Sequence, residues 1–250
     1  SADTGDLTLS NLRSLFEEQF RGAYWQSIKL SAATAVIGGL IGLLMAYAAL
    51  SAGAPRWIRP VLTTFSGVAA NFAGVPLAFA FVATLGNAGL VTELLSDHFG
   101  LDIYDHGFTL FSFWGLVATY VYFQIPLMIL VVAPAIDGLR IQWREAAENL
   151  GATPLQFWRH VGLPVLAPSL LGALLLLFAN AFSAYATAYA LTSGAAVELV
   201  PLLIGSAISG DVFSNANQAD ALAVGMIVIV TLTVVGYSLL QRRAGRWQRS

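Results

Sequence analysis

Residues that could carry out catalysis or hold a metal are few in this 250-residue sequence. The histidines are His98, His106 and His160. The first two stand in a polar stretch with three acidic residues, namely Asp97, Asp102 and Asp105. Their spacing matches no common metal site, so we interpret the stretch as a solvated loop and predict no metal centre.

The motifs of common hydrolases and ATPases are also missing. The sequence has neither a Gly-x-Ser-x-Gly elbow nor a His-Glu-x-x-His pair. A phosphate-binding loop needs a lysine after a glycine-rich turn, whereas the single lysine, Lys29, follows Gln26-Ser27-Ile28. Without cysteine, thiolate chemistry and disulfides are excluded as well. We therefore expect no catalytic residue and no cofactor.

A second group of polar residues lies inside long apolar runs, where polar side chains are costly. Asn180, Ser183 and Thr187 recur at intervals of three and four, which predicts a polar stripe on one helix face beside Tyr185. Such a stripe either lines a solute path or makes hydrogen bonds between helices, and the sequence leaves both open. Further path candidates in other apolar runs are Asn71, Gln124, Tyr120 and Tyr122.

The apolar runs themselves are typical of a membrane protein. Hydrophobic residues make up 57% of the sequence and charged residues 10%, against about 25% charged in soluble domains. A bilayer is crossed by about 20 apolar residues. We predict an all-α, polytopic helical bundle whose spans lie at about 30–52, 60–85, 109–133, 165–191 and 221–241.

Shorter features complete this arrangement. Residues 1–29 have the apolar spacing of an amphipathic surface helix, and residues 199–210 are too few to span. The first residue is Ser1, which fits a longer gene product with an earlier span. Gly38 and Gly42, four residues apart, predict close helix packing. Pro76 and Pro126 lie inside predicted spans, where prolines predict bends.

The basic residues indicate the orientation of the chain. Most of the 12 fall on one side if the N-terminus is outside, and such an excess is typical of the cytoplasmic side. The residues on that side are Arg56, Arg59, Arg140, Arg144, Arg159, Arg242, Arg243, Arg246 and Arg249, against Arg13, Arg21 and Lys29. Residues 137–164 and the basic tail 242–250 are therefore predicted to be cytoplasmic.

Residues 137–164 are predicted to form two short helices joined by a tight turn. The first helix ends at Gly151, which tolerates a left-handed backbone. Thr153 and Gln156 form a capping box, and Pro154 occupies the first helical position. We expect the second helix to stop near Gly162, because Pro164 interrupts the hydrogen-bond ladder.

The spacing within this segment resembles the EAA signature of inner-membrane permeases of binding-protein-dependent ABC importers. The matching positions are Glu145, Ala146, Ala147, Gly151, Leu163 and Pro164, with Val161 where isoleucine is usual. The resemblance implies the type I importer fold and makes residues 137–164 a coupling segment that docks on an ATPase subunit. Glu145 would contact the ATPase, and Ala146 and Ala147 would allow close approach.

The resemblance also implies the partners and the location. We expect two ATP-binding cassette ATPase subunits, a second permease subunit that is homologous or identical, an extracytoplasmic solute-binding protein and surrounding lipid, with no nucleic acid. The location would be the bacterial inner membrane. The run Phe182 to Gly194 is most similar to polyamine permeases, with thiamine, ferric iron and phosphonate systems as alternatives. A secondary transporter, a channel or a membrane enzyme is the rival, but intramembrane charge, inverted repeats and clustered catalytic residues are not found.

Overall fold

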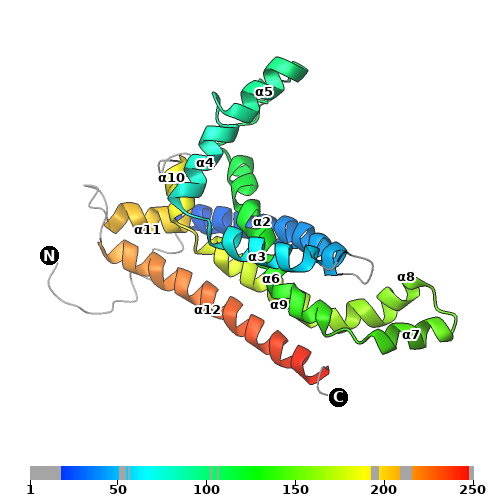
Figure 1. The fold of residues 1–250 in the computed structure, drawn as a ribbon. Helices are drawn as coiled ribbons and strands as arrows, with labels where there is room; N and C mark the ends of the chain where they lie inside the picture. The colour runs from blue at the N-terminus through cyan, green and yellow to red at the C-terminus, as the bar shows by residue number, and fades with distance from the viewer. Residues whose placement is uncertain are drawn as a thin grey trace. The chain divides into compact units, whose positions relative to one another are not determined.

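A computed structural model describes residues 18–50, 55, 57–101, 103–105, 107–192, 197–208 and 216–247, without side chains for 18–19, 216–218 and 243–247. Every regular element assigned in these ranges is a helix, which confirms the all-α prediction (Figure 1). Most of the predicted surface segment 1–29 and the end of the basic tail lie outside the described residues, as do Arg56, Asp102 and His106.

Five stretches of the described residues are long and apolar enough to cross a membrane, the number expected from the sequence. They are Phe20–Leu50, Val75–Phe99, Phe113–Asp137, Pro154–Phe182 and Ala219–Arg242. Three of them lie in long helices, namely α2 (Glu18–Leu50), α6 (Phe113–Asp137) and α12 (Ala216–Trp247). Since α2 begins at Glu18, the predicted boundary near residue 30 lies within a helix.

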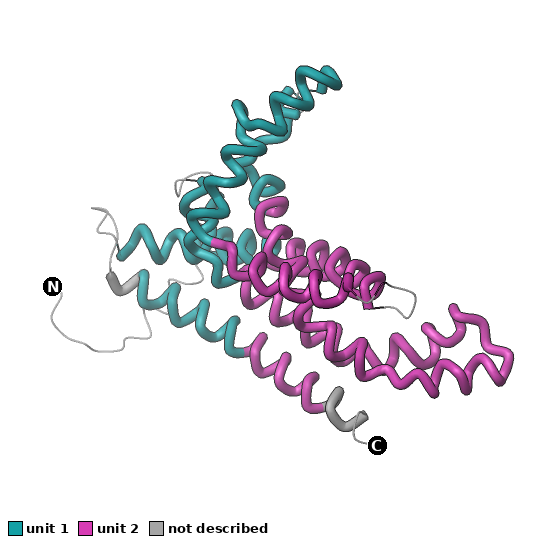
Figure 2. Tube along the Cα trace, in the orientation of Figure 1, with its two compact units in different colours: residues 1–30, 74–116, 182–231 teal, residues 31–73, 117–181, 232–250 magenta. Residues whose placement is uncertain are grey.

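The helices divide into two compact units, coloured separately in Figure 2. Unit 1 comprises residues 1–30, 74–116 and 182–231, and unit 2 comprises residues 31–73, 117–181 and 232–250. The helices that contribute residues to both units are α2, α6, α12 and α9 (Leu163–Phe182).

The predicted span 60–85 is two helices instead of one. Helix α3 (Ile58–Asn71) ends before Gly74, whose φ of 76° favours glycine, and α4 (Val75–Leu85) begins directly after it. Pro76 lies in the first turn of α4, where its missing N–H leaves no helical hydrogen bond unmade, so it starts a helix and does not bend one. With α5 (Leu90–Phe99), α4 makes up the second candidate span.

The predicted span 165–191 is also interrupted. Helix α9 ends at Phe182, residues 183–185 are not helical, and α10 (Ala186–Thr192) follows. The apolar composition of the run hid this break, because Ser, Ala and Tyr suit a helix as well as a turn. Pro126 and Pro134 lie inside α6, and Pro168 lies inside α9.

Unit 2 is built around a close approach of α2 to α6. A side-chain carbon on Gly38 would lie 2.5 Å from Cβ of Gln124, and one on Gly42 would lie 2.6 Å from the Ile125 carbonyl oxygen. Both positions therefore require glycine, which confirms the predicted packing role. The buried residues that surround this approach are Ala35, Ala46, Met128, Ile129, Val132, Ala173 and Leu177.

Unit 1 is joined by hydrogen bonds between segments distant in sequence. The Tyr24 hydroxyl donates to the Leu222 carbonyl at 2.7 Å, and the Val200 N–H donates to the Ser27 hydroxyl at 2.9 Å. Val200 begins α11 (Val200–Ile208), the helix that corresponds to the short apolar run 199–210. These bonds satisfy polar groups that would be costly to leave unpaired in an apolar surrounding.

Candidate functional site

The predicted coupling segment, residues 137–164, begins with a helix that the described residues leave largely exposed. Helix α7 (Ile141–Asn149) is separated from α6 by residues 138–140, and none of its nine residues is buried. Arg144 donates to the Glu148 carboxylate at 2.9 Å, but both side chains are more than half exposed, so the pair stabilises α7 little. A nine-residue helix of this kind is marginal on its own.

The end of α7 has the geometry of a Schellman motif. Gly151 has φ of 74°, its N–H donates to the Glu148 carbonyl at 2.9 Å, and the Ala152 N–H donates to the Ala147 carbonyl at 2.9 Å. A Cβ on Gly151 would meet no atom within 4 Å. The requirement for glycine therefore comes from the backbone angle alone, as the sequence predicted.

The second helix starts with the predicted capping box. The Gln156 N–H donates to the Thr153 hydroxyl at 3.3 Å, and the Thr153 N–H donates to the Gln156 side-chain oxygen at 2.8 Å. Pro154 is the first residue of α8 (Pro154–Phe157). Helices α7 and α8 contact each other and lie side by side in Figure 1. The turn at Gly151 therefore folds the second helix back along the first.

The predicted stop near Gly162 is wrong, because the helix continues into the next span. A π-helical turn, η1 (Trp158–Gly162), joins α8 to α9, and the Leu163 N–H donates to the Trp158 carbonyl. Pro164 lacks an N–H and its ring would clash with the carbonyl four residues earlier in a regular helix. A wider turn immediately before Pro164 relieves that conflict and keeps the helix intact.

An aromatic contact attaches this turn to α2. The rings of Tyr47 and Trp158 meet edge to face with centroids 5.0 Å apart. The Trp158 ring lies over Gly162, where a Cβ would stand 2.6 Å from it. Neither Tyr47, Trp158 nor Gly162 was a predicted site residue. A glycine four residues after a tryptophan was the available signal for this packing.

The motif residues lie mostly on accessible surface. Glu145, Ala146, Leu163 and Pro164 are exposed, and Ala147 is partly buried. Large apolar side chains are exposed beside them, with Leu150 at 88% and Leu155 at 79%. Exposed apolar residues on a pair of short, positioned helices are typical of a protein-binding surface.

The polar stripe predicted in the fourth span is not a helix face. Asn180 lies in α9, Ser183 lies in the break, and Thr187 lies in α10, so their regular spacing does not align them. Thr187 is buried and its hydroxyl accepts a hydrogen bond from the Gly74 N–H at 2.9 Å, which is the helix-packing alternative. Asn180 and Ser183 are exposed.

Tyr185 and Ser183 lie on a pocket of unit 1. Its volume is about 400 Å³, and Gly205 and Met226 also line it. The Tyr185 ring stacks on Tyr189 with centroids 5.3 Å apart. This pocket combines one aromatic face, a hydroxyl and apolar surface.

The remaining path candidates make local contacts within unit 2. Gln124 is fully buried and donates to the Leu177 carbonyl at 2.8 Å, while its side-chain oxygen has no partner among the described residues. Asn71 is exposed and donates to the Gly67 carbonyl at 2.8 Å. Tyr120 is buried, and the Tyr122 ring contacts Phe72. Within the described ranges, no group of three His, Asp or Glu residues is arranged to hold a metal.

Comparison with known proteins gives the family. The family described as "Binding-protein-dependent transport system inner membrane component" matches residues 38–249. The chain is 27% identical to the trehalose transport system permease protein SugB of Mycobacterium tuberculosis, over 95% of this chain and 78% of that protein. It is 26% identical to the spermidine/putrescine permease protein PotB of Haemophilus influenzae, over 92% and 78%. The sulfate permease protein CysT of Salmonella typhimurium is 24% identical over 91% and 79%.

A solved structure shares the fold. A bacterial ABC transporter involved in the import of the acidic polysaccharide alginate matches with a TM-score of 0.67, covering 98% of this chain and 85% of that one at 19% identity. The relatives are permeases and not enzymes, in agreement with the absence of catalytic motifs. The chain belongs to the binding-protein-dependent transport system inner membrane components, the multi-pass permeases of ABC importers.

Proposed function

We propose that the coupling segment, residues 137–164, is the surface on which the importer's ATPase subunit docks. The observation that carries the proposal is α7, a helix without a buried residue that is nevertheless held by a Schellman turn and a capped second helix. The turn and the cap fix the backbone of the segment, while the outward face of α7 packs against none of the described residues closely enough to be buried. A separate protein is the natural partner for such a face.

The residues of the motif have separate roles in this proposal. Glu145 supplies an exposed charge that can pair with a basic group of the ATPase. The small side chains of Ala146 and Ala147 let the partner's backbone come close. Gly151 sets the angle between α7 and α8 through its positive φ.

Motion of the docked segment would be passed to the membrane spans through the continuous helix. Residues 154–182 form α8, η1 and α9 without a break, so a displacement of α8 moves α9 directly. The Tyr47 and Trp158 rings connect the same turn to α2. Packed helices move as bodies, which suits a switch between inward-facing and outward-facing states.

The proposed assembly contains three kinds of partner, of which the family name mentions the binding protein. Two ATP-binding cassette subunits bind and hydrolyse ATP, a second permease completes the path, and an extracytoplasmic binding protein delivers solute. The lack of a phosphate-binding lysine in this chain supports a separate ATPase. We place the N-terminus of the chain outside and the C-terminus in the cytoplasm, on the strength of the arginine excess around the coupling segment.

For the solute we propose a polyamine. Spermidine/putrescine permeases recur among the relatives, including one 30% identical over 53% of this chain. Asn180, Ser183 and Tyr185 are the residues we propose to contact it. Amide and hydroxyl oxygens accept hydrogen bonds from ammonium groups, and tyrosine faces attract cations. Permeases for trehalose and sulfate are also among the relatives, so these two solutes are the alternatives to a polyamine.

Reversing the charge of Glu145 tests the docking surface. Glu145→Lys should abolish copurification of the ATPase subunit, because a charge-assisted contact becomes a repulsive one. The measurement is the amount of ATPase recovered with affinity-tagged permease. Glu198→Lys, at an exposed glutamate outside the candidate spans, is the control and should retain the ATPase. Full recovery of ATPase with Glu145→Lys contradicts the proposal.

Substitution of Gly151 tests the turn separately from the contact. Gly151→Val should strongly reduce ATP-driven uptake, since a non-glycine residue at this φ costs about 1–2 kcal/mol while no neighbouring atom is displaced. Gly151→Asn should retain more uptake, because asparagine tolerates the left-handed region. Gly67→Val, in a helical position with open space, is the control, and membrane insertion should be normal in all three. Equal uptake by the valine and asparagine variants would show that the backbone angle is unimportant.

Uptake by the reconstituted importer with its cognate binding protein tests the solute. We expect ATP-dependent accumulation of spermidine and little of trehalose or sulfate. Tyr185→Ala should raise the KM for spermidine severalfold, whereas Tyr185→Phe, which keeps the aromatic face, should stay close to the original value. Accumulation of trehalose or sulfate without spermidine refutes the polyamine proposal and leaves the docking proposal untouched.

A further inference from the structure

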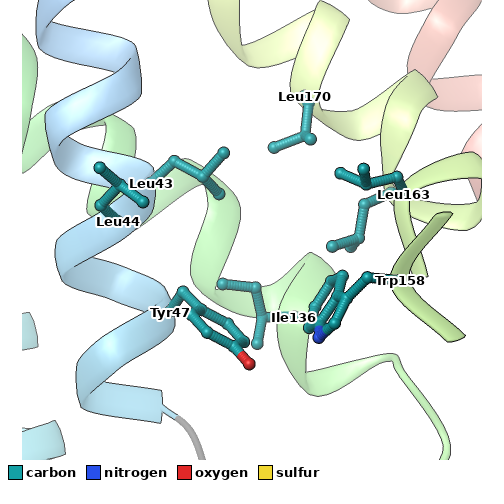
Figure 3. A pocket seen from close by; sticks show the side chains of 8 residues that line it. Leu43, Leu44, Tyr47, Ile136, Trp158, Leu163 and Leu170 are labelled. Atoms are coloured by element: carbon teal, nitrogen blue, oxygen red, sulfur yellow. The ribbon is translucent and has the colours of Figure 1, made fainter. Parts of the chain in front are cut away.

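Two pockets of unit 2 share Tyr47 and Trp158 in their linings and lie beside residues 137–164; we refer to the pair as the groove. The larger, which we call the acyl pocket, has a volume of about 270 Å³. Apart from Tyr47 and Trp158, its lining consists of leucine and isoleucine side chains from α2, α6 and α9, including Leu43, Leu44 and Leu170 (Figure 3). It offers no polar group to a ligand along most of its depth.

The acyl pocket has a polar end. In Figure 3 the Tyr47 hydroxyl and the Trp158 indole nitrogen lie at the same end, away from Leu170. Tyr47 is near the end of the first candidate span, and Ile136, also in the lining, is near the end of the third. Tyrosine and tryptophan are enriched where membrane spans meet water. We therefore expect the polar end of the pocket at the level of the lipid headgroups.

The smaller pocket lies against the same two aromatic side chains. It has a volume of about 60 Å³ and shares Tyr47 and Trp158 with the acyl pocket. Arg144, Glu148 and Thr153 also line it, and we call it the headgroup notch. Its charges are one cation and one anion at the mouth of an apolar pocket, which matches a zwitterionic amphiphile.

We propose that this groove binds one phospholipid with a phosphoethanolamine headgroup. An acyl chain fills the acyl pocket, the phosphate lies against Arg144, and the ammonium group lies against Glu148. The ion pair between these two residues is exposed and adds little stability, so the lipid charges can replace it. An α-helix, about 10 Å or more across, does not fit the notch, whereas single ionic groups do.

The headgroup chemistry makes the proposal selective. A primary ammonium donates three hydrogen bonds to a carboxylate, whereas the quaternary ammonium of phosphatidylcholine donates none. Phosphatidylglycerol has the phosphate but no cation for Glu148. This proposal requires only the fold of unit 2 and not the docking of an ATPase, so either can fail alone.

Native mass spectrometry of the delipidated importer complex, titrated with lipids of identical acyl chains, tests the proposal. We expect one phosphatidylethanolamine to bind about tenfold more tightly than phosphatidylcholine or phosphatidylglycerol, the effect of one charge-assisted hydrogen bond. Glu148→Gln should remove this preference, and Glu93→Gln should keep it. Equal binding of the three lipids by the unmodified complex overturns the proposal.

A second variant pair tests the acyl pocket. Leu44→Trp should block the bound lipid by filling the pocket, and its 59% exposure means that the larger side chain need not disturb the core. Leu40→Trp, one turn earlier on α2 and 56% exposed, does not line the pocket and should bind lipid normally. Thermal unfolding of both variants checks that they are folded. Unchanged phosphatidylethanolamine binding by folded Leu44→Trp also overturns the proposal.

Discussion

The close approach of α2 to α6 at Gly38 and Gly42 is the contact on which the rest of unit 2 depends. With hydrogen in place of a side chain, these glycines let α2 approach the backbone of Ile125 and the side chain of Gln124. Apolar burial between helices gains little when the surrounding lipid is equally apolar, so close packing and internal hydrogen bonds must stabilise the arrangement. Gln124 provides one such bond to the Leu177 carbonyl of α9.

That packing determines where the coupling segment is attached. Further along the same helices, α2 presents Tyr47 to Trp158 in the π-helical turn, and α6 ends at Asp137, which pairs with Arg59 of α3. The turn is continuous with α9 and carries α8 at its other end. Helices on both sides therefore position the segment, although none of the residues of α7 is buried by the described part of the chain. An exposed helix that is attached to packed membrane helices suits both the docking of a partner and the transmission of its motion.

Sequence reasoning succeeded where the chemistry is local. The Gly151 turn and the capping box of Thr153 and Gln156 depend on residues within one or two turns, so their types and spacing sufficed. The number of spans also followed from composition alone, although the second and fourth have other bounds than the predicted 60–85 and 165–191. Reasoning failed where tertiary packing decides the conformation. The π-helical turn depends on Pro164 together with the packing of Trp158 on Gly162, and no one of these residues predicts it. The helix break after Phe182 lies in an apolar run that contains no helix-breaking residue. The regular spacing of Asn180, Ser183 and Thr187 consequently predicted a stripe that the chain does not form.

Cross-linking from α7 tests the central claim, that the coupling segment meets the ATPase, most directly. The sequence contains no cysteine, so a single cysteine at Gln142, exposed on α7, gives an unambiguous attachment point for a short cross-linker. A second protein with a cysteine at Asp97, exposed on α5, serves as the comparison. The account predicts a covalent product of permease and ATPase from position 142 and none from position 97. No product from position 142 in an assembled, transport-competent complex, or an equal product from position 97, would contradict it.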